Sequence, residues 1–340
     1  MLRKVEFMTQ SAFSPSAHRI PGAFSRFDPE QSTVILQPDN SGPGNWIGCP
    51  GVLYEPQQRR FLMTYRQRHP RGNPATERGW RCAVAASEDG IHFRDLWAVE
   101  KSQLGTSSME RFCLLPGEKG GYLLYMSYVD PADNRWRIDC VEADTPDAFD
   151  VRTAKPVLTA ASTGTEGIKD PYVLRMGPAV YLFASFASAE TLDQKQRAQA
   201  HATADIYNTG ATTHPTGLAT GLDGRNFEWQ GTVLEVGSGW DRYQARLNSM
   251  APLPGGAWIG FYDGSAGAEE NYEERCGLAI SHDLRHWHRL TPGGPWVVSP
   301  HSTGSLRYQD VVPVGDELWL YYEYARADGA HELRMSKLRG

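Results

Sequence analysis

Pairs of short apolar strands recur along the chain, and a short polar motif precedes each pair. One unit consists of the polar motif, an apolar strand, a Gly-containing turn and a second strand rich in Tyr and Trp. The five copies cover residues 46–66, 109–128, 168–185, 243–262 and 307–322. Helical periodicity is scarce: 188–203 predicts either a short helix or a long loop, and 209–221 predicts a loop. The pattern therefore predicts an all-β protein.

The spacing of the copies sets the number of repeats. Aligning Cys49, Glu110, Asp170, Ala245 and Asp310 gives separations of 61, 60, 75 and 65 residues. Four short strands with their turns fit such a period, which is the size of a large propeller blade. Five units fit 340 residues, so we expect one domain over residues 1–340. The predicted fold is a five-bladed β-propeller with four-stranded antiparallel blades.

The last copy lacks an outer strand, because the sequence ends soon after its inner strands. The stretch 32–37 is extended in pattern and precedes the first copy. We expect this N-terminal strand to close the last blade, which would remove an exposed sheet edge.

A second signature marks the turns in the outer part of the units. At 87–93, 222–227 and 281–287 an aromatic residue follows an Asp by four positions. Asp and Gly tolerate the positive φ of a tight turn. We therefore interpret Asp89, Asp223 and Asp283 as turn formers, with the aromatic side chains packed between neighbouring blades.

Polar residues at the starts of the inner strands are the candidate chemistry. In a propeller the innermost strands open on one face, so equivalent residues converge there. The aligned set holds three carboxylates, Glu110, Asp170 and Asp310. Such carboxylates suit glycosidic bond cleavage, in which one acid protonates the leaving oxygen and a carboxylate activates water or attacks the anomeric carbon. Candidate substrate-binding residues beside them are Trp46, Arg66, Arg111, Tyr243, Gln244, Arg246 and Gln309.

Composition narrows the possible partners. The formal net charge is −6 and no basic stripe is present, which argues against nucleic acid or an anionic membrane and is compatible with a sugar. No apolar run reaches 18 residues, and residues 1–21 lack the apolar stretch of a secretory signal. The five scattered cysteines predict buried thiols in a reducing compartment, so we expect a cytoplasmic protein. No metal triad and no cofactor motif stands out, so neither a metal nor a cofactor is expected.

Two of the polar motifs carry a family resemblance. Lys169-Asp170-Pro171 resembles the Arg-Asp-Pro and Asp-Pro motifs of the five-bladed propeller glycosidases, namely glycoside hydrolase family 43 and its relatives in families 32, 62, 68 and 117. Met109-Glu110-Arg111 resembles the acidic motif of the second blade in the mannoside phosphorylases of family 130. The chain departs from families 43 and 32 in its first blade, where Cys49 aligns with their essential Asp. Their acid on the third blade is usually a Glu, where this chain has Asp170.

The leading hypothesis is a glycoside hydrolase acting on a small oligosaccharide or glycoside. Asp170 would be the general acid or the carboxylate that adjusts the pKa of the general acid, and Glu110 and Asp310 are the alternatives for the base or nucleophile. Arg66, Arg111 and Arg246 would orient the substrate, and the family resemblance favours inversion.

Two other functions stay open at this point. One is a phosphorylase of the mannoside-phosphorylase type, which predicts Arg and His near the nucleophile. The other is a non-catalytic sugar-binding propeller, in which Glu110–Arg111 is an interblade ion pair and the aromatic residues only pack. The sequence leaves the sugar, its linkage and the oligomeric state open.

Overall fold

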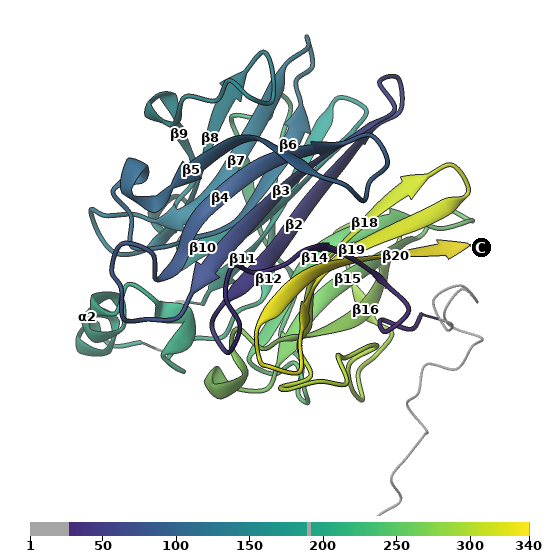
Figure 1. Ribbon diagram of the computed structural model, residues 1–340. Helices are drawn as coiled ribbons and strands as arrows, with labels where there is room; N and C mark the ends of the chain where they lie inside the picture. Colours follow the sequence, from purple (N-terminus) through teal and green to yellow (C-terminus); the bar gives the residue numbers. More distant parts are fainter. Residues whose placement is uncertain (1–26, 189–191, 340) are drawn as a thin grey trace, which may run out of the picture.

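Strands make up almost all of the regular structure in the computed structural model, which describes residues 27–188 and 192–339 (Figure 1). Hydrogen bonding joins them into one 12-stranded sheet and two four-stranded sheets. Antiparallel pairing divides these strands into five successive sets of four, which we call groups, and single parallel pairs, Arg275 with Leu306 and Trp46 with His331, connect three of the groups in the larger sheet. The first group is β2 (Trp46–Glu55), β3 (Arg60–His69), β4 (Arg78–Ser87) and β5 (Arg94–Glu100), and the second is β6 (Met109–Pro116), β7 (Tyr122–Val129), β8 (Trp136–Ala143) and β9 (Lys155–Leu158). The third is β10 (Gly167–Met176), β11 (Ala179–Ala187), β12 (Thr216–Gly221) and β13 (Glu228–Leu234). The fourth is β14 (Gln244–Pro252), β15 (Trp258–Ser265), β16 (Arg275–Ser281) and β17 (His288–Arg289), and the fifth is β18 (Leu306–Val314), β19 (Glu317–Ala325), β20 (His331–Arg339) and β1 (Thr33–Leu36).

The outer strand of the fifth group comes from the other end of the sequence. β1 pairs antiparallel with β20, and Thr33 lies opposite Met335. This is the pairing expected for the stretch 32–37, and it covers an edge that β20 would otherwise expose. The expectation about residues 1–21 lies outside the described residues.

Helices are few and short. α2 (Gln194–Ala202) forms within the stretch 188–203, where Asp193 caps its N-terminus by accepting a hydrogen bond from the Gln196 backbone. Within residues 27–188 and 192–339 the other helical segments are α1 (Ala160–Thr163), η3 (Lys101–Leu104), η4 (Val151–Thr153), η5 (Ile206–Asn208) and η6 (Ala268–Glu270). The prediction of a loop over 209–221 is wrong at its end, because β12 pairs there with β11. Its Gly217 lies directly under the Trp229 ring, a close approach that only glycine permits.

The first strands of the five groups, which we call the central strands, neighbour one another in the cyclic order β2, β6, β10, β14 and β18. Each contains a register shift against its second strand. Three residues within these bulges, Cys49, Asp170 and Tyr308, have positive φ values of 54°, 59° and 52°. A bulge re-aims a side chain, so these positions face a common centre.

The bulges correct the alignment drawn from the sequence. The residues equivalent to Glu110 and Asp170 are Asn248 and Tyr308, because the shifts fall between Leu247 and Ser249 and between Arg307 and Asp310. Asp310 lies two residues beyond the bulge position. A repeat period alone does not show where each strand takes up its extra residue.

The outer turns behave as predicted. Asp89 accepts hydrogen bonds from the backbones of Ile91 and His92, and Asp223 and Asp283 make equivalent bonds in their own turns. The aromatic residue of the first turn, Phe93, packs edge-on against Tyr321 of the fifth group. The turns therefore join neighbouring groups.

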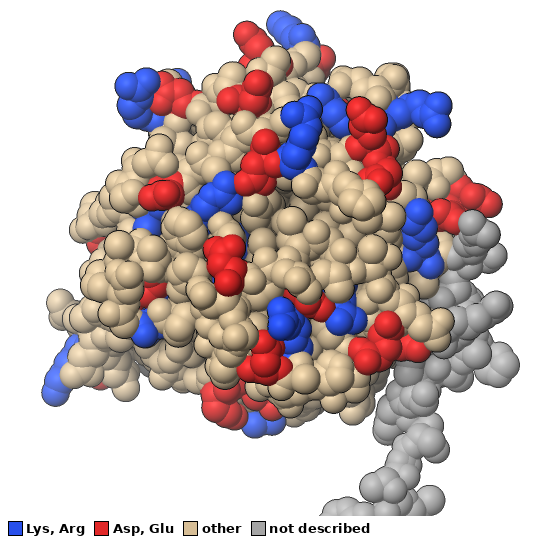
Figure 2. Space-filling view, in the orientation of Figure 1, with Lys and Arg blue, Asp and Glu red and all other residues tan. Residues whose placement is uncertain are grey.

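The core consists of apolar clusters between neighbouring groups. One of them joins Leu62 and Val84 of the first group to Phe112 and Leu124 of the second. All five cysteines are buried free thiols, as predicted. Among the described residues, no helix is long and apolar enough to cross a membrane. On the face drawn in Figure 2, basic and acidic side chains are interspersed rather than gathered by sign.

We predict that Gly79→Ala destabilises the contact between the first and second groups. A Cβ at Gly79 would lie 1.7 Å from the Met109 carbonyl oxygen, so β4 and β6 would have to move apart. Urea unfolding should show a loss of about 2 kcal/mol or more. Gly294→Ala is the matched control, because a Cβ there meets nothing within 4 Å. Equal stability of the two variants would contradict this account.

Candidate active site

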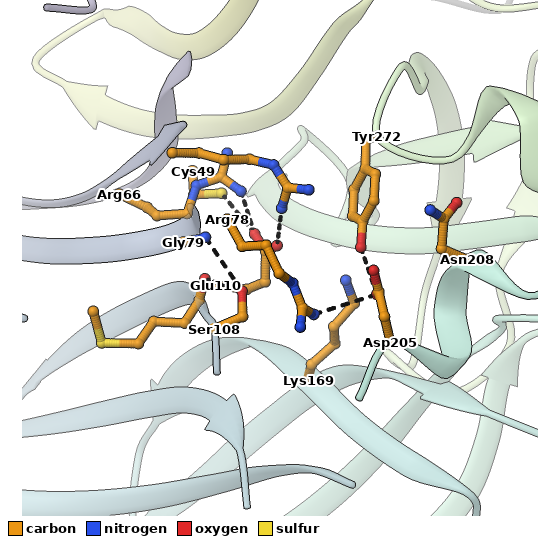
Figure 3. Close-up of polar contacts among 12 residues, drawn as sticks. Cys49, Arg66, Arg78, Gly79, Ser108, Glu110, Lys169, Asp205, Asn208 and Tyr272 are labelled. Atoms are coloured by element: carbon orange, nitrogen blue, oxygen red, sulfur yellow. Dashed lines mark hydrogen bonds and ion pairs between the residues drawn. The ribbon is translucent and has the colours of Figure 1, made fainter. Parts of the chain in front are cut away.

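Glu110 lies at the centre of the polar site and is completely buried. Its Oε2 accepts a hydrogen bond from Arg66, and its Oε1 lies 3.3 Å from Nη1 of Arg68 (Figure 3). The Cys49 thiol lies 3.7 Å from the same Oε2. Burial alone raises the pKa of Glu110, but Arg66, Lys169 and Arg68 outweigh it and lower the pKa to about 2. Glu110 is therefore ionised at neutral pH.

Asp170 is the second carboxylate of the site and comes from the neighbouring central strand. It is 1% exposed, and its Oδ2 accepts a hydrogen bond of 2.9 Å from Arg246. Its Oδ1 accepts a hydrogen bond of 3.3 Å from the Arg111 backbone, and Lys169 Nζ lies 3.6 Å from its Oδ2. The left-handed backbone at Asp170 turns this side chain toward Glu110 rather than along the strand.

The Tyr308 hydroxyl lies between the two carboxylates. It is 3.4 Å from Glu110 Oε2 and 3.4 Å from Asp170 Oδ2, and it can donate to either one. Burial raises the pKa of Tyr308 well above its ordinary value, so the hydroxyl keeps its proton. The Arg246 guanidinium stacks over its ring at 3.8 Å. Glu110, Tyr308 and Asp170 therefore form a continuous polar path across the centre.

Alternating charges connect this path to all five groups of strands. We call the set the ion-pair ring, because the links run from Glu110 through Arg66, Glu323, Arg307, Glu274 and Arg246 to Asp170, and Tyr308 closes the circle. Its members are the cations Arg66, Arg68, Lys169, Arg246 and Arg307 and the carboxylates Glu110, Asp170, Asp263, Glu274 and Glu323. Arg68 has the most exposed side chain, at 7%. Five arginine and lysine side chains face five carboxylates, and the buried His331 pairs with Glu323 as well, at 2.7 Å. Each buried charge of the ring therefore lies against a group of opposite sign, as burial of charge requires.

The carboxylates of the ion-pair ring differ in their titration. Burial raises the pKa of Glu323 and Glu274, but Arg307 and a second arginine beside each outweigh it and lower both pKa values. The pKa of Asp263 is raised to about 6 by burial, with Arg246 opposing and Glu274 adding to the rise. Asp263 thus takes up a proton more readily than Glu110, Glu274 and Glu323.

Asp310 is not part of this cluster. Its side chain accepts a hydrogen bond from the Val52 backbone and pairs with Arg111 at 3.2 Å. It lines a cavity of about 320 Å³ formed by the later residues of β2, β6, β10 and β18. Burial raises the pKa of Asp310 to about 6, although Arg111 lowers it. The register of the bulge puts Asp310 toward the other end of the central strands.

The other residues predicted to bind substrate divide between the ring and its surroundings. Arg66 and Arg246 belong to the ring, whereas the Arg111 side chain turns away to Asn248 and Asp310. Gln244 donates to Glu274 at 2.9 Å, while both amide atoms of Gln309 are buried without a partner among the described residues.

The two aromatic candidates pack against protein groups. Trp46 stacks on His331, with ring centres 4.5 Å apart, and Arg68 and Arg307 lie over its ring. The Tyr243 hydroxyl donates to the Tyr207 carbonyl at 2.8 Å. Both side chains are only 7% exposed, so neither ring offers a free face to a sugar in this structure.

Several ring members were missed from the sequence, although a signal for them exists. The second strand of each unit is apolar and aromatic, yet Asp263 follows Phe261-Tyr262 and Glu323 follows Tyr321-Tyr322. Opposite them on the central strands lie Arg246 and Arg307. A charged residue within an apolar strand predicts a buried partner. Glu274 lies in a loop before β16 and gives no such signal.

The fold is shared with solved carbohydrate-active proteins. No family model matches the chain, and no curated protein matches it. A thermostable family-43 glycoside hydrolase matches with a TM-score of 0.62 and 12% identity over 90% of this chain and 93% of its own. A GH43_1 enzyme from Xanthomonas citri matches with 0.59 and 14% over 93% of this chain and 92% of its own. A β-1,2-mannobiose phosphorylase from Listeria innocua matches with 0.57 and 14% over 91% and 94%. The predicted likeness to propeller glycosidases is confirmed at the level of the fold.

We predict that Arg66→Met strongly destabilises the protein. The change leaves Glu110 and Glu323 buried with one cation fewer, and breaking a buried pair in this way costs about 3–5 kcal/mol. Urea unfolding at pH 7 measures the loss. Arg152→Met is the control, because the pair between Arg152 and Asp150 is exposed and its removal should leave stability unchanged. A stable Arg66→Met protein would show that the ring is not needed for folding.

Asp310 predicts a pH dependence of stability. Since its pKa is raised in the folded protein, the folded state holds the proton more tightly than the unfolded chain. This contribution is present below about pH 4 and is lost as the pH rises to about 6. The free energy of unfolding of wild type relative to Asp310→Asn should therefore fall by on the order of 2 kcal/mol from pH 4 to pH 7. A difference that stays constant over this range would contradict the raised pKa.

Proposed function

We propose that the protein is a glycoside hydrolase whose reacting groups are Glu110 and Asp170. In this proposal the five groups of strands are the blades of one propeller domain spanning residues 1–340, and the central strands line its axis. The observation that supports the assignment best is the convergence of Glu110 and Asp170 from neighbouring central strands onto one tyrosine hydroxyl. Two carboxylates across a sugar site are what glycosidic bond cleavage requires.

Glu110 is assigned as the base or nucleophile, because its low pKa keeps it ionised. Asp170 is assigned as the acid that protonates the leaving oxygen. Tyr308, which retains its proton, is placed to donate a hydrogen bond to Glu110 or Asp170 and so to hold the two carboxylates in position. In this scheme Arg246 holds Asp170 in position rather than contacting the substrate.

The separation of the two carboxylates supports retention of configuration. Since each oxygen lies 3.4 Å from the Tyr308 hydroxyl, the two oxygens are no more than twice that distance apart. This upper limit only reaches the lower end of the range for inverting enzymes, about 6.5–9.5 Å, whereas retaining enzymes have about 5–5.5 Å. The geometry thus argues against the inversion that the family resemblance favoured.

Burial indicates the size of the substrate. Glu110 is 0% and Asp170 1% exposed, so a sugar reaches them only when the side chains above them move. A terminal sugar residue or a small glycoside fits this constraint better than the middle of a long polysaccharide.

Phosphorolysis is the second candidate function. Arg66, Arg68 and Lys169 all act on the charge of Glu110, and cations in this position would also suit phosphate as the attacking group. Each arginine already pairs with a carboxylate, which favours hydrolysis.

The test is the hydrolysis of a panel of aryl glycosides by wild type, Glu110→Gln and Asp170→Asn, with and without phosphate. Either substitution should lower kcat/KM by about 10²–10⁴-fold. Asp310→Asn is the matched control and should stay within about tenfold of wild type, because Asp310 lines a cavity that Glu110 and Asp170 do not line. Thermal unfolding of each variant shows whether it is folded. Full activity in folded Glu110→Gln and Asp170→Asn would refute the assignment, and a phosphate requirement would select phosphorolysis.

A further inference from the structure

Lys169 is a buried cation whose hydrogen-bond donors are unused. Its side chain is 1% exposed, and its nearest charged partner is Asp170 at 3.6 Å. It has no hydrogen-bond partner within residues 27–188 and 192–339. The rings of Tyr207, Trp136 and Tyr272 surround the ammonium at 4.4, 5.0 and 5.9 Å.

This environment stabilises the charge of Lys169 only in part. Aromatic faces attract an ammonium group, but they do not replace the hydrogen bonds that it had in water. A buried ammonium whose nearest carboxylate lies 3.6 Å away, beyond hydrogen-bond distance, therefore still has donors with which to bind an anion. The sugar site proposed above lies beside it, since Lys169 precedes Asp170 and lowers the pKa of Glu110.

Arg68 adds a second cation on the same side of Glu110. One nitrogen of its guanidinium lies 3.3 Å from Glu110, and the group stacks over Tyr272 at 4.2 Å. A guanidinium has five donors, and only one hydrogen bond from this one is present among the described residues. Lys169 and Arg68 thus both lie against the Tyr272 ring.

A carboxylate from the chain itself faces these cations. Asp205 accepts hydrogen bonds from the Tyr272 hydroxyl and, at 2.8 Å, from Arg71, and it lies 3.6 Å from Arg78. Figure 3 shows the Lys169 side chain pointing toward the pair formed by Asp205 and Arg78. We call Arg71, Arg78, Asp205 and Tyr272 the cover.

The backbone of the cover is strained. Arg78 and Tyr272 have φ values of 60° and 74°, and Ala204, which accepts a hydrogen bond from Arg78, has 51°. Positive φ is costly for residues other than glycine and is concentrated at binding and active sites. Three such residues from three separate groups of strands meet here.

The charge of the site suits a ligand with one negative charge. The ring and the cover together hold seven arginine and lysine side chains and six carboxylates, but the Arg71 side chain is 54% exposed, so the buried cations and carboxylates are equal in number. A monoanion adds less unbalanced charge beside Glu110 and Asp170 than a dianion does.

We propose that Lys169 and Arg68 form a subsite for the carboxylate of an acidic sugar, so that the substrate is the glycoside of a hexuronic acid. The cleavage of such a glycoside rests on the proposed function, whereas the binding of the acidic sugar by Lys169 and Arg68 does not. The shared chemistry is an anionic oxygen group, which inorganic phosphate also supplies. The smaller negative charge of a carboxylate, placed beside Glu110 and Asp170, favours the sugar carboxylate over phosphate.

The test measures binding to the full chain by thermal shift and calorimetry, without any need for turnover. Glucuronate and galacturonate are compared with glucose and galactose, which differ from them in having a hydroxymethyl group in place of the carboxylate, and with acetate and phosphate at the same ionic strength. The uronates should bind at least tenfold more tightly than the neutral sugars. Lys169→Met should abolish this preference, whereas Lys155→Met, at an exposed lysine of β9, should keep it.

If Lys169→Met does not fold, Lys169→Arg replaces it, because this variant keeps the positive charge. Lys169→Arg should retain the preference for uronates, and the double variant Lys169→Arg, Arg68→Met should lose it. Equal binding of acidic and neutral sugars by wild type would overturn the proposal. A shift with phosphate alone that depends on Lys169 would also overturn it and would assign the subsite to phosphate. Uronate binding without any glycosidase activity would support the subsite and refute only the proposed function.

Discussion

Alternating guanidinium, ammonium and carboxylate groups, all removed from water, hold the five central strands against one another. Burying each of these charges costs several kcal/mol of lost hydration, and the cost is offset only while every neighbour keeps its partner. The ring therefore fixes the positions of the groups of strands more than it adds to stability. Gly48 shows how tight the arrangement is, because a Cβ there would lie 2.0 Å from a carboxylate oxygen of Glu323. The backbone of β2 is glycine at this point so that a ring carboxylate can occupy the space.

The same constraint produces the chemistry of the site. Arg66 and its neighbours keep Glu110 ionised, and the left-handed backbone at Asp170 and Tyr308 brings their side chains to the same centre. Cys49 has this backbone conformation too, but it contributes a thiol whose pKa burial raises well above the ordinary value. The first group thus adds no third carboxylate at this level. The site has two carboxylates and one tyrosine hydroxyl in place of the three acids expected from the sequence.

Arg111 separates two polar environments along the central strands. Its backbone N–H binds Asp170 in the ring, while its side chain extends to Asp310 in the cavity beyond. Asp310, which pairs with the Arg111 side chain, has a raised pKa. Glu110, the residue before Arg111 in the sequence, has a lowered pKa. Burial is common to both, so the number of cations around each carboxylate accounts for the difference.

The sequence was sufficient to predict the all-β class, the repeat, the Asp-containing turns, the pairing of β1 with β20 and the convergence of Glu110 and Asp170 on one centre. These follow from local pattern, because apolar strands, turn residues and polar motifs each leave a signal within a few positions. Tertiary structure alone decided that Asn248 and Tyr308, rather than Ala245 and Asp310, occupy the bulge positions, since one extra residue in a strand changes which side chains face the centre. The partners of Lys169, and the hydrogen bond that holds Asp205 beside Tyr272, are likewise visible only in the folded structure. Those contacts join residues from different groups of strands, and a buried charge has no pattern in the sequence that names its partner.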